Sequence, residues 1–179
     1  MKEELKRKKT NRLAIILALI VALWFAPILL AQEKAKSLKW VDHKPNPRFA
    51  IYDSGTPTDE SDDLVLDKEN GLIWARNANL LGKPLARKAA INLCQNLELC
   101  HLKGWRLPAK EELSSLIDPS QSVPALPKGH PFVNMKYTYW TSTTYEDFSD
   151  DAYFIHFGQG AVRAYTKHAK YEVWPVLGR

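Results

Sequence analysis

The segment LVLDKENGLIWA, residues 64–75, decides the first part of the fold because it has the pattern of a β-hairpin. Residues 64–67 and 72–75 are short runs of strand-forming side chains. Asn70-Gly71 lies between them, and this dipeptide is a strong signal for a tight turn. The sequence therefore predicts two adjacent antiparallel strands here.

Two helices are expected after the hairpin, over residues 85–99 and 109–117. Pro84 suits the start of the first helix, and Asp118-Pro119 ends the second, because the residue before a proline disfavours the helical conformation. The first helix has an apolar stripe of residues four apart and their neighbours: Leu85, Ala89, Leu93 and Leu97, flanked by Ala86, Ala90 and Cys94.

The last third of the chain is rich in aromatic and β-branched residues, which favour strands. Short strands are predicted before the hairpin and in this last third: residues 49–52, 139–143, 152–157, 161–166 and 171–177. Strands, two helices and strands again, in that order, indicate one α+β domain over residues 49–179 with small antiparallel sheets.

The N-terminal part has the pattern of a membrane anchor. Residues 13–31 carry no charge, and as a helix they would span about 28 Å, close to the thickness of a bilayer core. The basic segment 1–12 precedes them, so the positive-inside rule predicts a single pass across the cytoplasmic membrane, with the domain on the periplasmic or extracellular side. A signal peptide cleaved after Ala31 is the alternative. Residues 32–48 are expected to be a linker.

The charge distribution argues against a nucleic-acid partner. The chain has 25 basic and 20 acidic residues, of which residues 1–31 hold six and two. The remainder therefore has 19 basic and 18 acidic residues and no basic stripe to neutralise phosphates.

Four segments, in order, resemble the Lcl C-terminal domain family, which is named for a bacterial collagen-like adhesin. They are residues 65–74, residues 89–94 with 105–113, residues 139–143 and residues 152–176. The resemblance covers residues 49–179 and implies an extracytoplasmic module, since some members are adhesin domains that bind polysaccharide. The Trp-Arg-Leu-Pro stretch at 105–108 is also similar to formylglycine-generating and C-type-lectin-like folds. The motif residues expected to be structural are Trp74, Trp105, Arg106, Pro108, Trp140 and Trp174.

Cys94 and Cys100 are the two cysteines of the chain. An oxidising compartment favours a disulfide between them, because Cys94 lies near the end of the predicted helix and Cys100 just beyond it. Closing this short loop would stabilise the domain by about 2 kcal/mol.

Candidate ligand-binding residues are Arg106, Tyr145, Phe148, Lys167 and Lys170. Arg106 has a structural alternative, since a guanidinium can hold a loop by binding carbonyl groups. Tyr145 and Phe148 lie between predicted strands, where an exposed aromatic ring could stack on a sugar. Lys167 and Lys170, with His168, could form a basic patch for an acidic glycan, or a solvated turn.

No catalytic or metal-binding pattern stands out, so we expect neither enzymatic activity nor a cofactor. The acidic loop at residues 53–63 lacks the EF-hand pattern, and calcium binding there stays an open alternative.

The sequence therefore favours a membrane-anchored extracytoplasmic module that binds a glycan or an envelope protein. The alternative is an accessory subunit of a membrane complex, since Ala14, Ala18, Ala22 and Ala26 share one face of the anchor and would permit close helix packing.

Overall fold

The computed structural model describes residues 26, 29–31, 33–55 and 63–178, and the chain divides into two units, residues 1–37 and 38–179. In the first unit, residues 29–31 and 33–37 are helical. Among the described residues, no helix has the length and apolar character needed to cross a membrane. The anchor predicted at 13–31 lies outside the described residues except at positions 26 and 29–31, and it stays a prediction.

The second unit begins with an antiparallel sheet of five strands in the order β1-β2-β3-β4-β10. The strands are β1 (Val41–Asp42), β2 (Phe49–Tyr52), β3 (Leu64–Asp67), β4 (Leu72–Ala75) and β10 (Val176–Leu177). The bounds predicted for β2, β3 and β4 are confirmed, and Leu64 pairs with Ala75 as the hairpin requires. Strand β1 lies inside the predicted linker 32–48, so part of that segment belongs to the folded domain.

The two helices are shorter than predicted: α2 (Arg87–Asn96) and α3 (Lys110–Ser114). Helix α2 starts late because residues 85 and 86 form a strand, β5 (Leu85–Ala86), which pairs with β9 (Lys170–Tyr171). Its buried residues are Ala90 and Cys94, whereas Ala89 of the predicted stripe is exposed. The buried face is therefore rotated from the one that the leucine spacing predicted.

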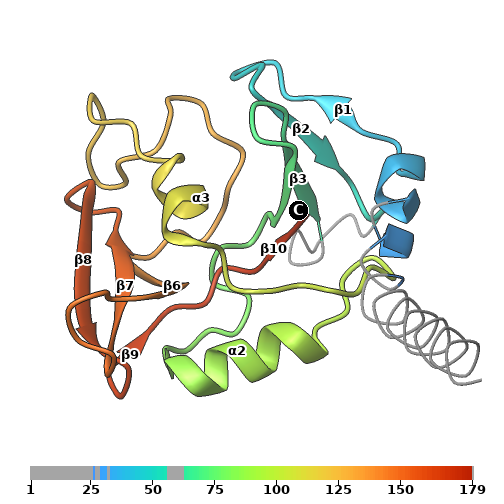
Figure 1. Ribbon diagram of the computed structural model, residues 1–179. Helices are drawn as coiled ribbons and strands as arrows, with labels where there is room; N and C mark the ends of the chain where they lie inside the picture. The colour runs from blue at the N-terminus through green and yellow to red at the C-terminus, as the bar shows by residue number, and fades with distance from the viewer. Residues whose placement is uncertain (1–25, 27–28, 32, 56–62, 179) are drawn as a thin grey trace, which may run out of the picture. The chain divides into compact units, whose positions relative to one another are not determined.

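A three-stranded antiparallel sheet lies at the side of the domain away from β1–β4 (Figure 1). Its strands are β6 (Thr138–Thr144), β7 (Asp151–His156) and β8 (Ala161–Thr166), close to the predicted bounds. The single strand predicted over 171–177 is instead β9 and β10, which belong to two different sheets. Pro175 between them has no N–H to donate, and consecutive residues Val173 and Trp174 are both buried, so the alternation of a strand is lost.

The core is built around Trp174, whose side chain is fully buried. Its ring centroid lies 5.2 Å from Trp74, 4.7 Å from Phe132, 5.4 Å from Tyr139 and 5.9 Å from Phe157. These rings come from strands β4, β6 and the segments around them, so one side chain joins the two larger sheets.

The predicted disulfide between Cys94 and Cys100 is not present. Cys94 faces the core, in a cluster with Leu107, Trp140 and Ala90, and this burial raises the pKa of its thiol to about 12. Cys100 lies beyond the end of α2, in the turn that reverses the chain between Leu99 and Leu102. The helix therefore directs Cys94 into the core.

The turn that holds Cys100 offers a test of backbone strain. Leu99 and Leu102 exchange two backbone hydrogen bonds of 3.1 and 2.8 Å across Cys100 and His101, whose φ angles are +50° and +59°. Two successive positive φ angles suit Asn-Gly and cost free energy for other residues. We expect the double variant Cys100→Asn/His101→Gly to raise the free energy of unfolding by about 1 kcal/mol in urea denaturation. The control variant His101→Ala keeps the strain and should bring no gain; an equal gain there would contradict this account.

Candidate functional site

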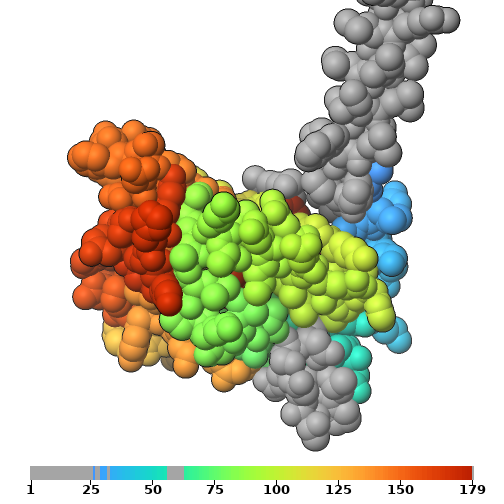
Figure 2. Space-filling model, turned by 90° about the horizontal axis from the view of Figure 1, so that it is seen from below, coloured from blue at the N-terminus to red at the C-terminus, as the bar shows by residue number. Residues whose placement is uncertain are grey.

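Aromatic side chains gather at the connection between β6 and β7, where Phe148 is exposed and Tyr145 and Tyr153 are half-buried. We call Tyr145, Phe148 and Tyr153 the aromatic surface. Phe148 is 65% exposed, and its ring lies 6.1 Å from that of Tyr145 at an interplanar angle of 32°. Tyr153 of β7 meets Tyr145 edge to face at 5.3 Å. The orange lobe in Figure 2, which holds this connection, stands out from the body of the domain.

The backbone holds this connection in one conformation. Tyr145 N–H donates to the Asp151 carbonyl (3.1 Å), and Asp151 N–H donates to the Phe148 carbonyl (3.0 Å). Lys167 adds two bonds, from its N–H to the Asp150 carbonyl (3.0 Å) and from its ammonium to the Ser149 carbonyl. A surface fixed in this way loses little conformational entropy when it binds a ligand.

Lys110 and Glu146 are joined to the aromatic surface. The Lys110 ammonium lies 4.2 Å from the centre of the Tyr153 ring and 3.7 Å from the Glu146 carboxylate. The Tyr153 hydroxyl donates to Glu146, and this hydrogen bond raises the pKa of Tyr153 to about 12 and lowers the pKa of Glu146. Tyr153 therefore stays a hydrogen-bond donor at neutral pH.

Sequence reasoning placed Tyr145 and Phe148 at this connection but did not single out Lys110. Lys110 is the first residue of α3, and nothing in its neighbourhood along the chain points to Tyr153, 43 positions later. The available signal is the cluster of carboxylates at residues 146–151, which favours a nearby cation.

Arg106 is committed to contacts within the domain. Its guanidinium donates to both carboxylate oxygens of Glu112 (2.7 Å each) and to the Gly178 carbonyl (2.7 Å). Its backbone N–H and C=O both bond to Val176 at 3.0 Å. Glu112 in turn accepts the Ala109 N–H at the start of α3 (2.7 Å). The arrangement fixes the C-terminal strand to α3, which is the structural role weighed for Arg106 against ligand binding.

The other motif residues are also buried. The indole N–H of each of three tryptophans donates to a backbone carbonyl: Trp105 to Leu102, Trp140 to Leu85 and Trp174 to Ala75. Trp74 is fully buried and its ring packs against that of Trp174 at an interplanar angle of 52°, while the Pro108 carbonyl accepts the Ser142 N–H at 2.7 Å. These residues build the scaffold behind the aromatic surface.

The predicted basic patch is divided. The Lys167 ammonium supports the β6–β7 connection, as described above. Lys170 lies on β9 opposite Ala86, and its side chain is exposed, as is that of His168. Of the three basic residues, Lys167 is therefore the one whose hydrogen bond, to the Ser149 carbonyl, directs it toward the aromatic surface.

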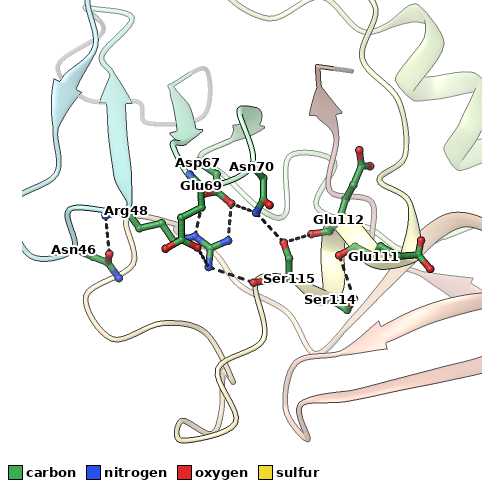
Figure 3. A network of polar contacts seen from close by, with 9 residues as sticks. All are labelled: Asn46, Arg48, Asp67, Glu69, Asn70, Glu111, Glu112, Ser114 and Ser115. Carbon is green, nitrogen blue, oxygen red and sulfur yellow. Dashed lines mark hydrogen bonds and ion pairs between the residues drawn. The ribbon is translucent and has the colours of Figure 1, made fainter.

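A second polar cluster joins the five-stranded sheet to α3 (Figure 3). Arg48 donates to the two oxygens of Asp67 at 3.0 and 2.6 Å and to the Ser115 carbonyl at 3.2 Å. Asn70 bridges Asp67 (2.9 Å) and the Ser115 hydroxyl (3.1 Å). Asp67 is completely buried, and burial tends to raise the pKa of its carboxyl, but the bonds from Arg48 and Asn70 outweigh this and lower it. A hollow of about 130 Å³ lies beside this cluster. The cluster's bonds are internal, which indicates a structural role.

A larger hollow, of about 340 Å³, lies near the acidic loop and is lined by Val41, Asp42, His43, Ile51, Asp53, Asp63 and Arg76. The Asp63 carboxylate accepts hydrogen bonds from the Arg76 guanidinium (2.7 Å) and from the Ser54 N–H (3.0 Å). Within the described part of the chain, no three His, Cys, Asp or Glu residues are placed to hold a metal ion. Residues 56–62 of the acidic loop lie outside that part, so calcium binding there stays an open alternative.

These features define a small α+β domain in which antiparallel sheets pack around an aromatic core and one hairpin connection displays an aromatic surface. The chain belongs to the Lcl C-terminal domain family, whose model matches residues 63–177. The resemblance identified from the sequence is thus confirmed, and it points to a cell-surface, adhesin-like domain. None of the curated proteins and none of the solved structures compared with the chain is similar enough to count as a match. The C-type-lectin-like fold therefore stays a prediction.

Proposed function

We propose that the chain is a non-enzymatic, membrane-anchored module of the cell envelope that binds a glycan through the aromatic surface. The observation that carries this proposal is the 65% exposure of Phe148 on a connection whose backbone is fixed by hydrogen bonds. A large apolar ring held open to water on a rigid support costs solvation free energy, and contact with a ligand would recover it.

The geometry of the rings suits a sugar chain better than a compact ligand. Phe148 and Tyr145 are tilted by only 32°, so they can present neighbouring faces to successive rings of one chain. The apolar C–H face of a pyranose stacks on such a ring, while its hydroxyl groups need polar partners at the rim. Glu146 and Lys110 supply an acceptor and a donor at that rim.

The anchor is proposed on the sequence alone. Residues 1–12 are basic and residues 13–31 are apolar, which favours a single pass with the domain outside the cytoplasm. The mass of the mature protein isolated from membranes tests this: an intact chain supports a retained anchor, and a chain that begins at residue 32 supports a cleaved signal peptide.

Replacement of Phe148 by alanine is expected to weaken glycan binding roughly tenfold, because one stacked ring contributes on the order of 1–1.5 kcal/mol. The free energy of unfolding should change little, since most of the ring is already exposed. The measurement is isothermal titration of the purified protein with the oligosaccharides that it retains in a glycan array.

The matched control is Tyr165→Ala. Tyr165 is also an exposed aromatic residue, 56% accessible, but it lies on β8 and outside the aromatic surface. Binding unchanged in Tyr165→Ala and weakened in Phe148→Ala supports the proposal. Retention of no glycan by the wild-type protein, or equal binding by all three proteins, contradicts it.

A further inference from the structure

The aromatic surface lies in an acidic part of the domain. Four of the seven residues at 145–151 are carboxylates: Glu146, Asp147, Asp150 and Asp151. A fifth, Glu111, lies 3.5 Å from the Lys110 ammonium at the edge of the same surface. Asp147 and Asp150 flank Phe148 in the sequence at one and two positions, and both are exposed.

The two lysines at this surface make contacts within the domain, as do three of the five carboxylates: Glu111 and Glu146 lie beside Lys110, and Asp147 accepts a hydrogen bond from the Tyr145 hydroxyl. Lys110 lies between the Tyr153 ring, Glu111 and Glu146. Lys167 donates its ammonium to the Ser149 carbonyl. Lys110, Glu111, Lys167 and the four carboxylates at residues 146–151 together carry a formal charge of −3 at neutral pH.

From this arrangement we infer that the aromatic surface selects a glycan whose sugar units carry amino groups, such as a partly deacetylated polysaccharide, and disfavours acidic or sulfated glycans. This inference rests on the proposed function and names its ligand class. An ammonium group on a stacked sugar meets carboxylates at the rim and the electron-rich faces of Tyr145 and Phe148. A sulfate or carboxylate at the same place is repelled, so the charge of the surface opposes the acidic glycan that the Lys167–Lys170 segment alone suggests.

The test compares chitosan oligosaccharides with their N-acetylated counterparts and with heparin oligosaccharides of similar length. Titrations are made at about pH 6 and low salt, where the amines are largely protonated and the carboxylates ionised. We expect the amino form to bind about fivefold tighter than the acetylated form, with the difference shrinking as salt is added, and heparin to bind weakest.

The double variant Asp147→Asn/Asp150→Asn removes two negative charges, and the amide oxygen at position 147 can still accept the hydrogen bond that the Tyr145 hydroxyl donates to Asp147. It should abolish most of the preference for the amino form while its affinity for the acetylated form stays the same. The matched control Asp42→Asn/Glu98→Gln makes the same change in net charge on β1 and beyond the end of α2, and it should keep the preference.

The outcomes separate the two proposals. Equal binding of the amino and acetylated forms, or tighter binding of heparin, overturns the charge selection, while the proposed function still stands if Phe148→Ala weakens binding. Preference lost equally in both double variants also overturns it, because the effect would then follow net charge and not this surface. Retention of a lysine-rich peptide with no oligosaccharide bound would identify a protein partner and overturn both proposals.

Discussion

Replacement of Trp174 by alanine is expected to lower the free energy of unfolding by about 3–5 kcal/mol. Trp174 is fully buried and its ring contacts four other aromatic rings, from Trp74, Phe132, Tyr139 and Phe157. Alanine would leave a cavity among rings that are held by the two larger sheets and cannot close over it. A loss of this size is a large share of the stability of an ordinary domain, so we expect the variant to unfold at a much lower urea concentration or temperature.

Two further variants define the origin of this loss. Trp174→Phe keeps an aromatic ring but loses the indole N–H that donates to the Ala75 carbonyl at 2.8 Å, and it should cost about 1–2 kcal/mol. Trp40→Ala removes a half-buried tryptophan whose ring lies 6.1 Å from Tyr52, and it should cost less than Trp174→Ala. Equal losses for Trp40→Ala and Trp174→Ala would show that the aromatic cluster around Trp174 is not the centre of the core.

The role of Trp174 also shows which parts of the fold local sequence can predict. Strands β3 and β4 have their predicted bounds because a turn dipeptide between short apolar runs specifies a hairpin locally, and β2 is a short run of the same strand-forming kind. Strand β5 was missed because Pro84 and Leu85 equally suit the start of a helix. Its strand character comes from pairing with β9, where Leu85 pairs with Tyr171 and Ala86 with Lys170, and no local pattern indicates a partner so far along the chain.

In the candidate site, too, the sequence predicts local features and misses the contacts between distant segments. Tyr145 and Phe148 were found because they lie between two predicted strands, where side chains tend to be exposed. The contact of Lys110 with Tyr153, and the use of Lys167 to support the connection, depend on how α3 and β8 pack beside it. The disulfide expected from cysteine spacing failed for a related reason, since helix orientation and not distance along the chain directs Cys94 into the core.

Replacement of Asp67 by asparagine is expected to cost about 3–5 kcal/mol at neutral pH. Asp67 is completely buried and accepts hydrogen bonds from Arg48, Asn70 and the Glu69 N–H. An asparagine at this place would turn its own N–H groups toward groups that also donate hydrogen bonds. The guanidinium of Arg48, which is 12% exposed, would in addition lose its buried counter-charge. The matched control is Glu69→Gln, which removes the second carboxylate near Arg48 (3.2 Å); because Glu69 is 64% exposed, we expect a loss below about 1 kcal/mol.

The same substitution should change how stability depends on pH. The pKa of Asp67 is lowered in the folded protein, so the ionised carboxylate contributes stability above its unfolded pKa of about 3.9. That contribution is lost as the pH falls through the lower, folded pKa, because the carboxyl must then bind a proton that weakens its bond to Arg48. Urea midpoints at about pH 7 and pH 3 should therefore differ less in Asp67→Asn than in the wild-type protein. If the variant and the wild type lost the same stability on acidification, the acid sensitivity of the domain would arise from other carboxylates, and the link between β3 and Arg48 would contribute through packing alone.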